Sequence, residues 1–103
     1  MIIRNVNKGD LSKLGEIYAS SFNAANPDEN WDATSAKKYL EDRFKKQPNI
    51  FILAEDDKNI VGGFVGSIEP CWMGNNLYET DLFVDNRHQR QNIEKNYLLK
   101  YSK

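Results

Sequence analysis

Apolar residues in the segment after residue 10 recur at intervals of three and four positions. The residues that keep this spacing are Leu11, Leu14, Tyr18 and Phe22. Side chains spaced in this way share one face, so the segment is predicted to be an amphipathic helix. Asp10 is expected to cap it, because a carboxylate accepts hydrogen bonds from the unpaired amides of a first turn. Residues 23–30 are polar and contain Pro27, which indicates a loop.

A second apolar stripe follows this loop and has the same helical spacing. Its members are Ala36, Tyr39, Leu40 and Phe44. Asp32 or Thr34 is expected to cap the second helix, with Trp31 as a hydrophobic residue before the cap. Pro48 is expected to stop it, because proline cannot continue a helix.

The remaining apolar segments have the composition or the alternation of β-strands. They are residues 2–6, 50–54, 60–68 and 77–84. Residues 56–59 are predicted to form a hairpin turn, and residues 70–76 a loop. The strand 60–68 contains three glycines, which weaken a strand unless another group approaches its backbone closely. Ile93, Tyr97, Leu98 and Tyr101 outline a final helix, which completes the order β-α-α-β-β-β-α.

This order predicts an α+β (mixed α/β) fold with an antiparallel central sheet and both early helices packed against it. We expect one hydrophobic core. Its predicted members are Ile3, Leu14, Tyr18, Tyr39, Leu40, Phe44, Phe51, Leu53, Phe64, Val65, Leu82 and Val84.

Composition narrows the class of protein. The chain has 103 residues, is 40% hydrophobic and 28% charged, and carries a formal net charge of −1, which predicts a single globular domain over residues 1–103. No apolar run approaches the roughly 20 residues of a membrane span, and no secretory signal is visible at the N-terminus. The lone Cys71 cannot form an internal disulfide and indicates a reducing cytoplasm. One cysteine and one histidine do not make a zinc site, so no metal is expected.

Positive charge gathers in residues 85–103, which contain five lysines and arginines against Asp85 and Glu94. Such a segment can contact a phosphate or can form a solvated helix face, and the charges alone leave both open. Nucleic-acid binding is not expected, because the chain is net acidic and has no recognised binding motif.

The most specific motif is residues 81–94, with the sequence DLFVDNRHQRQNIE. It combines a strand that ends in an apolar pair with a Gln-Arg-Gln segment that opens a helix. Together with Ile3-Arg4, Asp10-Leu11 and the hairpin sequence of residues 60–66, it resembles the N-terminal two-thirds of a GNAT-family N-acetyltransferase. The resemblance covers essentially the whole chain and implies a GNAT-like acyl-CoA N-acyltransferase fold that lacks the family's C-terminal strands and helix.

The resemblance also implies a site that takes acetyl-CoA as cofactor. The main chain of Leu82, Phe83 and Val84 would contact pantetheine. The pyrophosphate would lie at the start of the last helix, where unpaired amides attract anions; the residues there are Gln89, Arg90, Gln91, Asn92, Ile93 and Glu94.

Glu79 and Asp81 occupy the strand where family members often place the general base for the acceptor amine. At two residues apart they are expected to share one face of the strand. They are therefore either the catalytic carboxylates or an exposed pair of acids. Residues 29–31 and the loop before them resemble the acceptor side of bacterial members that acetylate small amines.

Two departures from the family pattern predict weak or absent acetyl-CoA binding. Asn92 and Glu94 stand where the motif has glycines, and a carboxylate near a pyrophosphate repels it. The chain also ends before the family strand that bounds the pantetheine arm. Two functions remain open: an N-acetyltransferase acting on a small amine, or a truncated, non-catalytic remnant. In both cases the exposed edge of the strand ending at Val84 predicts a homodimer.

Overall fold

The computed structural model describes residues 1–85. In chain order the elements are strand β1 (Ile2–Asn5), the 3₁₀ turn η1 (Lys8–Asp10), helices α1 (Leu11–Ala25) and α2 (Ala33–Lys45), and strands β2 (Asn49–Asp56), β3 (Asn59–Cys71) and β4 (Gly74–Val84). The predicted helix around residues 93–101 lies outside the described residues. No helix within residues 1–85 is long and apolar enough to cross a membrane.

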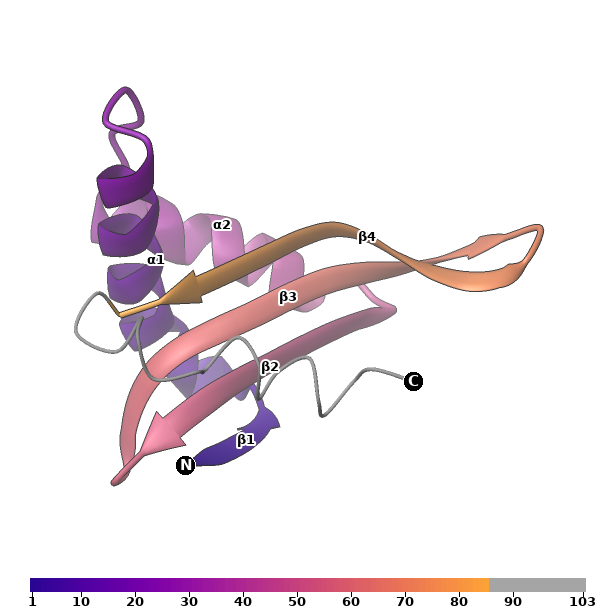
Figure 1. Cartoon of the computed structure of the whole chain (residues 1–103), viewed down its shortest axis with the longest axis horizontal. Coiled ribbons are helices and arrows are strands. Elements are labelled where there is room, and N and C mark those ends of the chain that lie inside the picture. The colour runs from indigo at the N-terminus through magenta and orange to yellow at the C-terminus, as the bar shows by residue number, and fades with distance from the viewer. Residues whose placement is uncertain (86–103) are drawn as a thin grey trace.

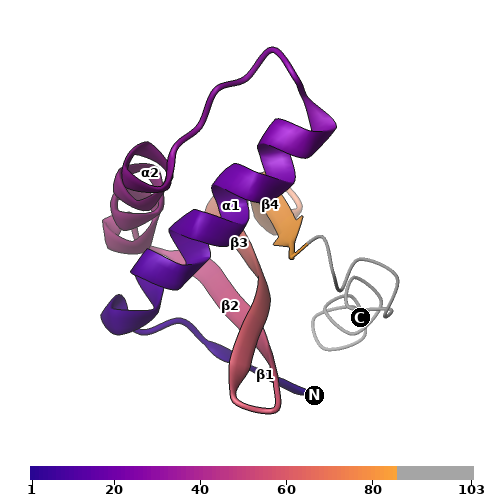
Figure 2. The same ribbon diagram turned by 90° about the vertical axis from the view of Figure 1, so that its left-hand side faces the viewer.

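The four strands form one antiparallel sheet in the order β1-β2-β3-β4. Both helices pack on the same face of this sheet, with α1 lying across the strands (Figures 1 and 2). The architecture therefore confirms the predicted α+β class. It follows from the two hydrophobic periods in the sequence, near 3.6 residues in the helices and 2 in the strands.

The apolar side chains form two clusters, one on each face of the sheet, rather than the single core predicted from the sequence. On the helix-covered face the predicted Leu14, Tyr18, Leu40, Phe51, Leu53 and Val65 are buried, with Tyr39 and Phe44 packed at the edge. Ile3, Phe64, Leu82 and Val84 belong to the opposite face. The single-core prediction was wrong because adjacent strand residues point to opposite faces.

Both hairpins are tighter than simple loops. Asp57 and Lys58 have positive φ angles of 52° and 66°, which suits a two-residue turn between antiparallel strands and confirms the predicted β2–β3 turn. The predicted loop at residues 70–76 was wrong: β3 and β4 stay paired as far as Cys71 and Gly74. They form an arm that projects beyond the start of β2 (Figure 1).

The helix starts match the sequence in one case and differ in the other. The Asp32 carboxylate accepts from the Ser35 N–H at 2.6 Å, which settles the predicted α2 cap between its two candidates. The Asp10 carboxylate does not cap α1; it accepts from the Asn7 N–H at 2.7 Å and from the Arg4 guanidinium. The Asp10 carboxylate bonds to Asn7 because the 3₁₀ turn η1 comes directly before α1 and Asp10 is its last residue.

Candidate functional site

A polar cluster joins helix α2 to strand β4 on the helix-covered face. The Tyr39 hydroxyl donates to the Asp81 Oδ2 at 2.5 Å. Arg43, one turn further along α2, donates to the same Oδ2 at 3.1 Å and to the Tyr39 oxygen at 2.8 Å. A second guanidinium nitrogen of Arg43 donates to the main-chain carbonyl oxygen of Glu79 at 2.6 Å.

Burial makes these contacts matter. The Arg43 side chain is only 8% exposed and that of Asp81 is 21% exposed, so each charge depends on the other for compensation. Burial raises the pKa of Tyr39, and its hydrogen bond to Asp81 adds to the rise while Arg43 opposes it. Burial, followed by the negative charge of Asp81, likewise raises the pKa of Tyr18. Both hydroxyls therefore keep their protons at neutral pH.

A β-bulge interrupts β4 beside this cluster. Val65 pairs with Asp81 and Ser67 with Tyr78, so Gly66 alone faces both Glu79 and Thr80. Glu79 adopts a φ of +52°, in the left-handed region. The expectation that Glu79 and Asp81 share one face was wrong, because the extra residue breaks the alternation. Asp81 directs its carboxylate to α2, whereas Glu79 contacts α2 through its carbonyl oxygen and its residue is exposed.

Beyond the bulge, β4 regains a regular ladder with β3. The Asp85 N–H donates to the Val61 carbonyl at 2.8 Å. Because bonded and non-bonded pairs alternate in an antiparallel ladder, the main chain of Phe83 also faces β3, and that of Leu82 faces away. Of the three residues predicted to offer main-chain groups to pantetheine, Phe83 is thus committed to the sheet. Its side chain is 1% exposed in the core.

Aromatic side chains pack around Tyr18, next to this cluster. Tyr18 lies 5.2–5.3 Å from Phe83, Trp31 and Tyr39, measured between ring centroids. The Trp31 main chain is fixed by two hydrogen bonds with the Asn23 side chain, at 2.7 and 2.9 Å. The connection between α1 and α2 is thereby held against the cluster, and the acceptor role of residues 29–31 stays a prediction.

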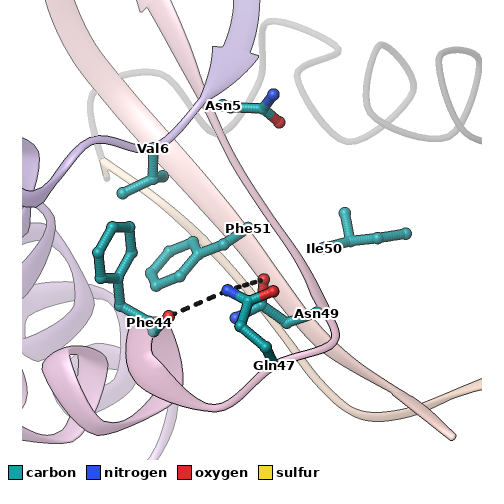
Figure 3. A pocket seen from close by; sticks show the side chains of 7 residues that line it. All are labelled: Asn5, Val6, Phe44, Gln47, Asn49, Ile50 and Phe51. Carbon is teal, nitrogen blue, oxygen red and sulfur yellow. Dashed lines mark hydrogen bonds between the residues drawn. The ribbon is translucent and has the colours of Figure 1, made fainter.

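Two cavities lie away from this cluster. One, of about 390 Å³, is at the start of β2 (Figure 3). It is lined by Asn5, Val6, Phe44, Gln47, Asn49, Ile50 and Phe51. None of these side chains is ionisable, so this cavity offers no acid or base.

A second cavity, of about 330 Å³, adjoins the end of β4. Its charged lining consists of Lys13, Asp56, Asp57 and Asp85. The excess of carboxylates makes it a poor site for phosphate. Within residues 1–85 no group of three or more His, Cys, Asp and Glu side chains is placed to hold a metal ion.

One part of the predicted site lies outside the described residues, and one residue of the cluster was not predicted. Residues 89–94, expected to bind the pyrophosphate, lie outside the described residues. Arg43 was missed by the sequence analysis, although it falls seven residues after Ala36 and three after Leu40, on the buried stripe of α2. That spacing could have identified Arg43 as a buried residue. Lysines and acids flank it in the sequence, and such a composition is typical of an exposed helix face.

Comparison with solved structures agrees with the fold. A possible acetyltransferase from Clostridium difficile 630 superposes with a TM-score of 0.77 at 18% identity, covering 97% of this chain and 66% of that one. A ribosomal-protein-alanine N-acetyltransferase from Brucella melitensis gives 0.71 at 20% identity, with 97% and 64% covered. A predicted acetyltransferase from Clostridium acetobutylicum, crystallised with acetyl-CoA, gives 0.72 at 16% identity, with 96% and 69% covered.

The chain spans about two thirds of the length of these structures. A search of curated proteins found no match. The model of the acetyltransferase (GNAT) family matches residues 11–98, from the start of α1 to beyond β4. This match takes in both helices, the bulged strand and residues 89–94, which are predicted to bind the pyrophosphate. The chain belongs to the GNAT family of acetyltransferases.

Proposed function

We propose that this chain transfers an acetyl group from acetyl-CoA to a small primary amine. The observation that carries the proposal is the bulged strand β4, which presents Asp81 to the helices and, one residue later, the outward-facing main chain of Leu82. The acidic side chain of Asp81 offers a site for the acceptor amine. The main chain of Leu82, the next residue, offers a site for the acetyl donor. Family membership supports acetyl transfer in general.

Asp81 is the residue we assign to the acceptor amine. Its two described donors both bind Oδ2, and no donor from residues 1–85 is assigned to Oδ1. Oδ1 is therefore the atom proposed to take the proton of the attacking amine. Glu79, exposed on the bulge, is the second proposed carboxylate and acts from the opposite side of the strand.

Bound acetyl-CoA would supply the acetyl group as a thioester. The amine nitrogen forms a bond to the carbonyl carbon, the carbon–sulfur bond breaks, and one proton passes from the amine to the released thiolate. Leu82 fits the donor side because its N–H and C=O face away from β3 and can bond the pantetheine amides. The Phe83 side chain anchors this stretch in the core.

We further propose that the chain binds acetyl-CoA weakly. Glu94 stands at a glycine position of the phosphate motif, and two like charges ~4 Å apart cost about 4 kcal/mol at an effective dielectric of about 20. Asn92, at the other glycine position, lacks the backbone freedom of glycine. Should binding be too weak for turnover, the chain is a non-catalytic member that keeps the fold.

Titration calorimetry with acetyl-CoA tests both statements. Glu94→Gln removes only the charge, and Asn92→Gly with Glu94→Gly also frees the backbone. We expect affinity to rise about tenfold in both variants, and most at low salt because salt screens charges. Glu69→Gln, on the exposed β3–β4 arm, changes net charge equally and should leave affinity unchanged.

The outcomes separate the two proposals. Tight binding by the wild-type chain contradicts the weak-binding statement. Absence of binding in every variant contradicts the acetyl-CoA-dependent function. Where a variant binds, release of free thiol with a panel of small amines measures transfer, and Asp81→Asn should abolish it while binding is kept.

We also propose that two copies pair along the part of β4 before the bulge, which leaves the main chain of Leu82 to the donor. Trp72 and Met73, at the end of the arm, are 92% and 76% exposed, and Leu77 and Tyr78 on β4 are 37% and 39% exposed. A strand edge with exposed apolar side chains favours pairing with another strand. Sedimentation should show a dimer at micromolar concentration, and Leu77→Lys should dissociate it. A monomeric wild-type chain would contradict this proposal.

A further inference from the structure

The bulge in β4 is built from a residue that does not favour its conformation. Glu79 has a φ of +52°, a region that glycine enters freely and a residue with a Cβ enters at a cost. Its neighbour across the ladder, Gly66, is the glycine of the pair, yet the positive φ falls on Glu79. Some other contact must therefore hold Glu79 in place.

Arg43 supplies that contact from α2. One guanidinium nitrogen donates to the Glu79 carbonyl oxygen at 2.6 Å, and the other end of the same fork donates to the Asp81 Oδ2 at 3.1 Å. The two bonds span the bulge, from its first residue to the first residue after it. A planar guanidinium fixes the spacing of its donors, so it sets the distance between these two oxygens.

Helix α2 is itself held where Arg43 must stand. The Asn49 side-chain amide donates to the Arg43 carbonyl at 2.8 Å, which ties the end of α2 to the start of β2. The Arg43 side chain is 8% exposed, so neither water nor another conformation competes readily for its donors. The position of the guanidinium is thus fixed by contacts outside the bulge as well.

We propose that Arg43 is a positioning residue that holds the β4 bulge open and thereby sets the direction in which Leu82 presents its main chain. This inference rests on the proposed acetyl-CoA function for its consequence, because Leu82 matters only if a ligand lies along β4. The clamp itself does not depend on that function. Removing the fork lets Glu79 leave the left-handed region, and the strand beyond it loses its fixed register.

Amide exchange and ligand titration by NMR on the full ¹⁵N-labelled chain test the clamp. In Arg43→Met, the Asp81 and Phe83 amides, which face β3, should exchange at least about tenfold faster relative to Leu53 in β2. Glu79→Gly added to Arg43→Met should restore protection, since glycine holds a positive φ without help. Arg43→Lys keeps the charge without the planar fork and should be intermediate.

Acetyl-CoA titration reads the consequence on the same samples. Shifts of the Leu82 and Val84 amides should report a dissociation constant about tenfold higher in Arg43→Met and close to that of the wild type after Glu79→Gly is added. Arg4→Met, at the far edge of the sheet, is the control and should stay within about twofold. If Arg43 served only global stability, adding Glu79→Gly would not restore the affinity for acetyl-CoA.

Each result decides the proposal. Unchanged exchange at Asp81 and Phe83 in Arg43→Met, or no restoration by Glu79→Gly, overturns it. If Arg43→Met does not fold, Arg43→Lys gives the same comparison. If the wild-type chain binds no acetyl-CoA, the proposed function fails while the exchange result still supports or overturns the clamp.

Discussion

Two arginines, at opposite edges of the same sheet, each bind a carboxylate from another element. Arg4 on β1 binds Asp10 of the 3₁₀ turn, at 2.8 and 3.0 Å, and Glu55 of β2. Arg43 on α2 binds Asp81 and the Glu79 carbonyl on β4. The side chain of Arg4 is 33% exposed, whereas that of Arg43 is 8% exposed.

The difference lies in what each arginine holds. Arg4 joins elements that the β1–β2 ladder already aligns, and water can replace part of its contacts. Arg43 holds a residue with a positive φ and neutralises a half-buried carboxylate at the proposed acceptor site. Arginine therefore forms partly exposed ion pairs at one edge of the sheet, whereas at the other edge it fixes the geometry of a strand.

Loss of Arg43 should give the largest effect. Arg43→Met leaves Asp81 without its counter-charge in a half-buried position, which costs about 3 kcal/mol of unfolding free energy or more. Urea denaturation measures it, with Lys45→Met on the exposed side of α2 as the control. A stability equal to that of the wild type would show that the two arginine clusters are energetically alike.

Loss of the Tyr39 hydroxyl should have a smaller effect in the same cluster. Tyr39→Phe removes the donor to Asp81 and the acceptor from Arg43 but keeps the ring packed against Tyr18. A net loss of about 1 kcal/mol is expected in urea denaturation, since a hydrogen bond contributes roughly that much. Tyr78→Phe, on the exposed part of β4, is the matched control and should cost less. Equal losses of unfolding free energy in Tyr39→Phe and Tyr78→Phe would show that the Tyr39 hydroxyl does not stabilise the cluster.

The sequence predicted these two regions unequally. Helix α2 followed from the apolar stripe through Ala36 and Leu40, and strand β2 from the apolar run of residues 50–54. The bulge could not be predicted, because Glu79 and Thr80 include no glycine or asparagine that would indicate a positive φ.

The contacts of the site share this limit. Asp81 was identified from its place in the motif, but its partners come from α2, about forty residues earlier in the chain. The sequence analysis did not single out Arg43, which acids and lysines flank. The division of the core between two faces also depended on register, which a single sequence leaves open where a strand is apolar throughout.

Arg4→Met should cost less than the changes at the buried cluster. Its ion pairs are partly exposed, and pairs of this kind contribute under about 1 kcal/mol. The loss should shrink further in 1 M salt, about the concentration at which screening acts within a few ångströms. Urea denaturation at low and high salt measures both. A loss of unfolding free energy as large as that of Arg43→Met would contradict the proposed difference between the two arginines.

The smallest effect concerns pH. The hydrogen bond from Arg4 holds the pKa of Asp10 below its ordinary value, helped by the Asn7 N–H and opposed by burial. A lowered folded-state pKa means that the carboxylate stabilises the fold above its unfolded pKa of about 3.9, and that this stabilisation is lost as pH falls through the folded value. Asp10→Asn should therefore flatten the decline in urea midpoint below about pH 4. Arg4→Met removes the donor and should flatten the same decline, with no further change when the two are combined. Identical acid profiles for Asp10→Asn and the wild type would show that the Arg4 cluster contributes nothing to acid stability, leaving its role to the geometry of the turn before α1.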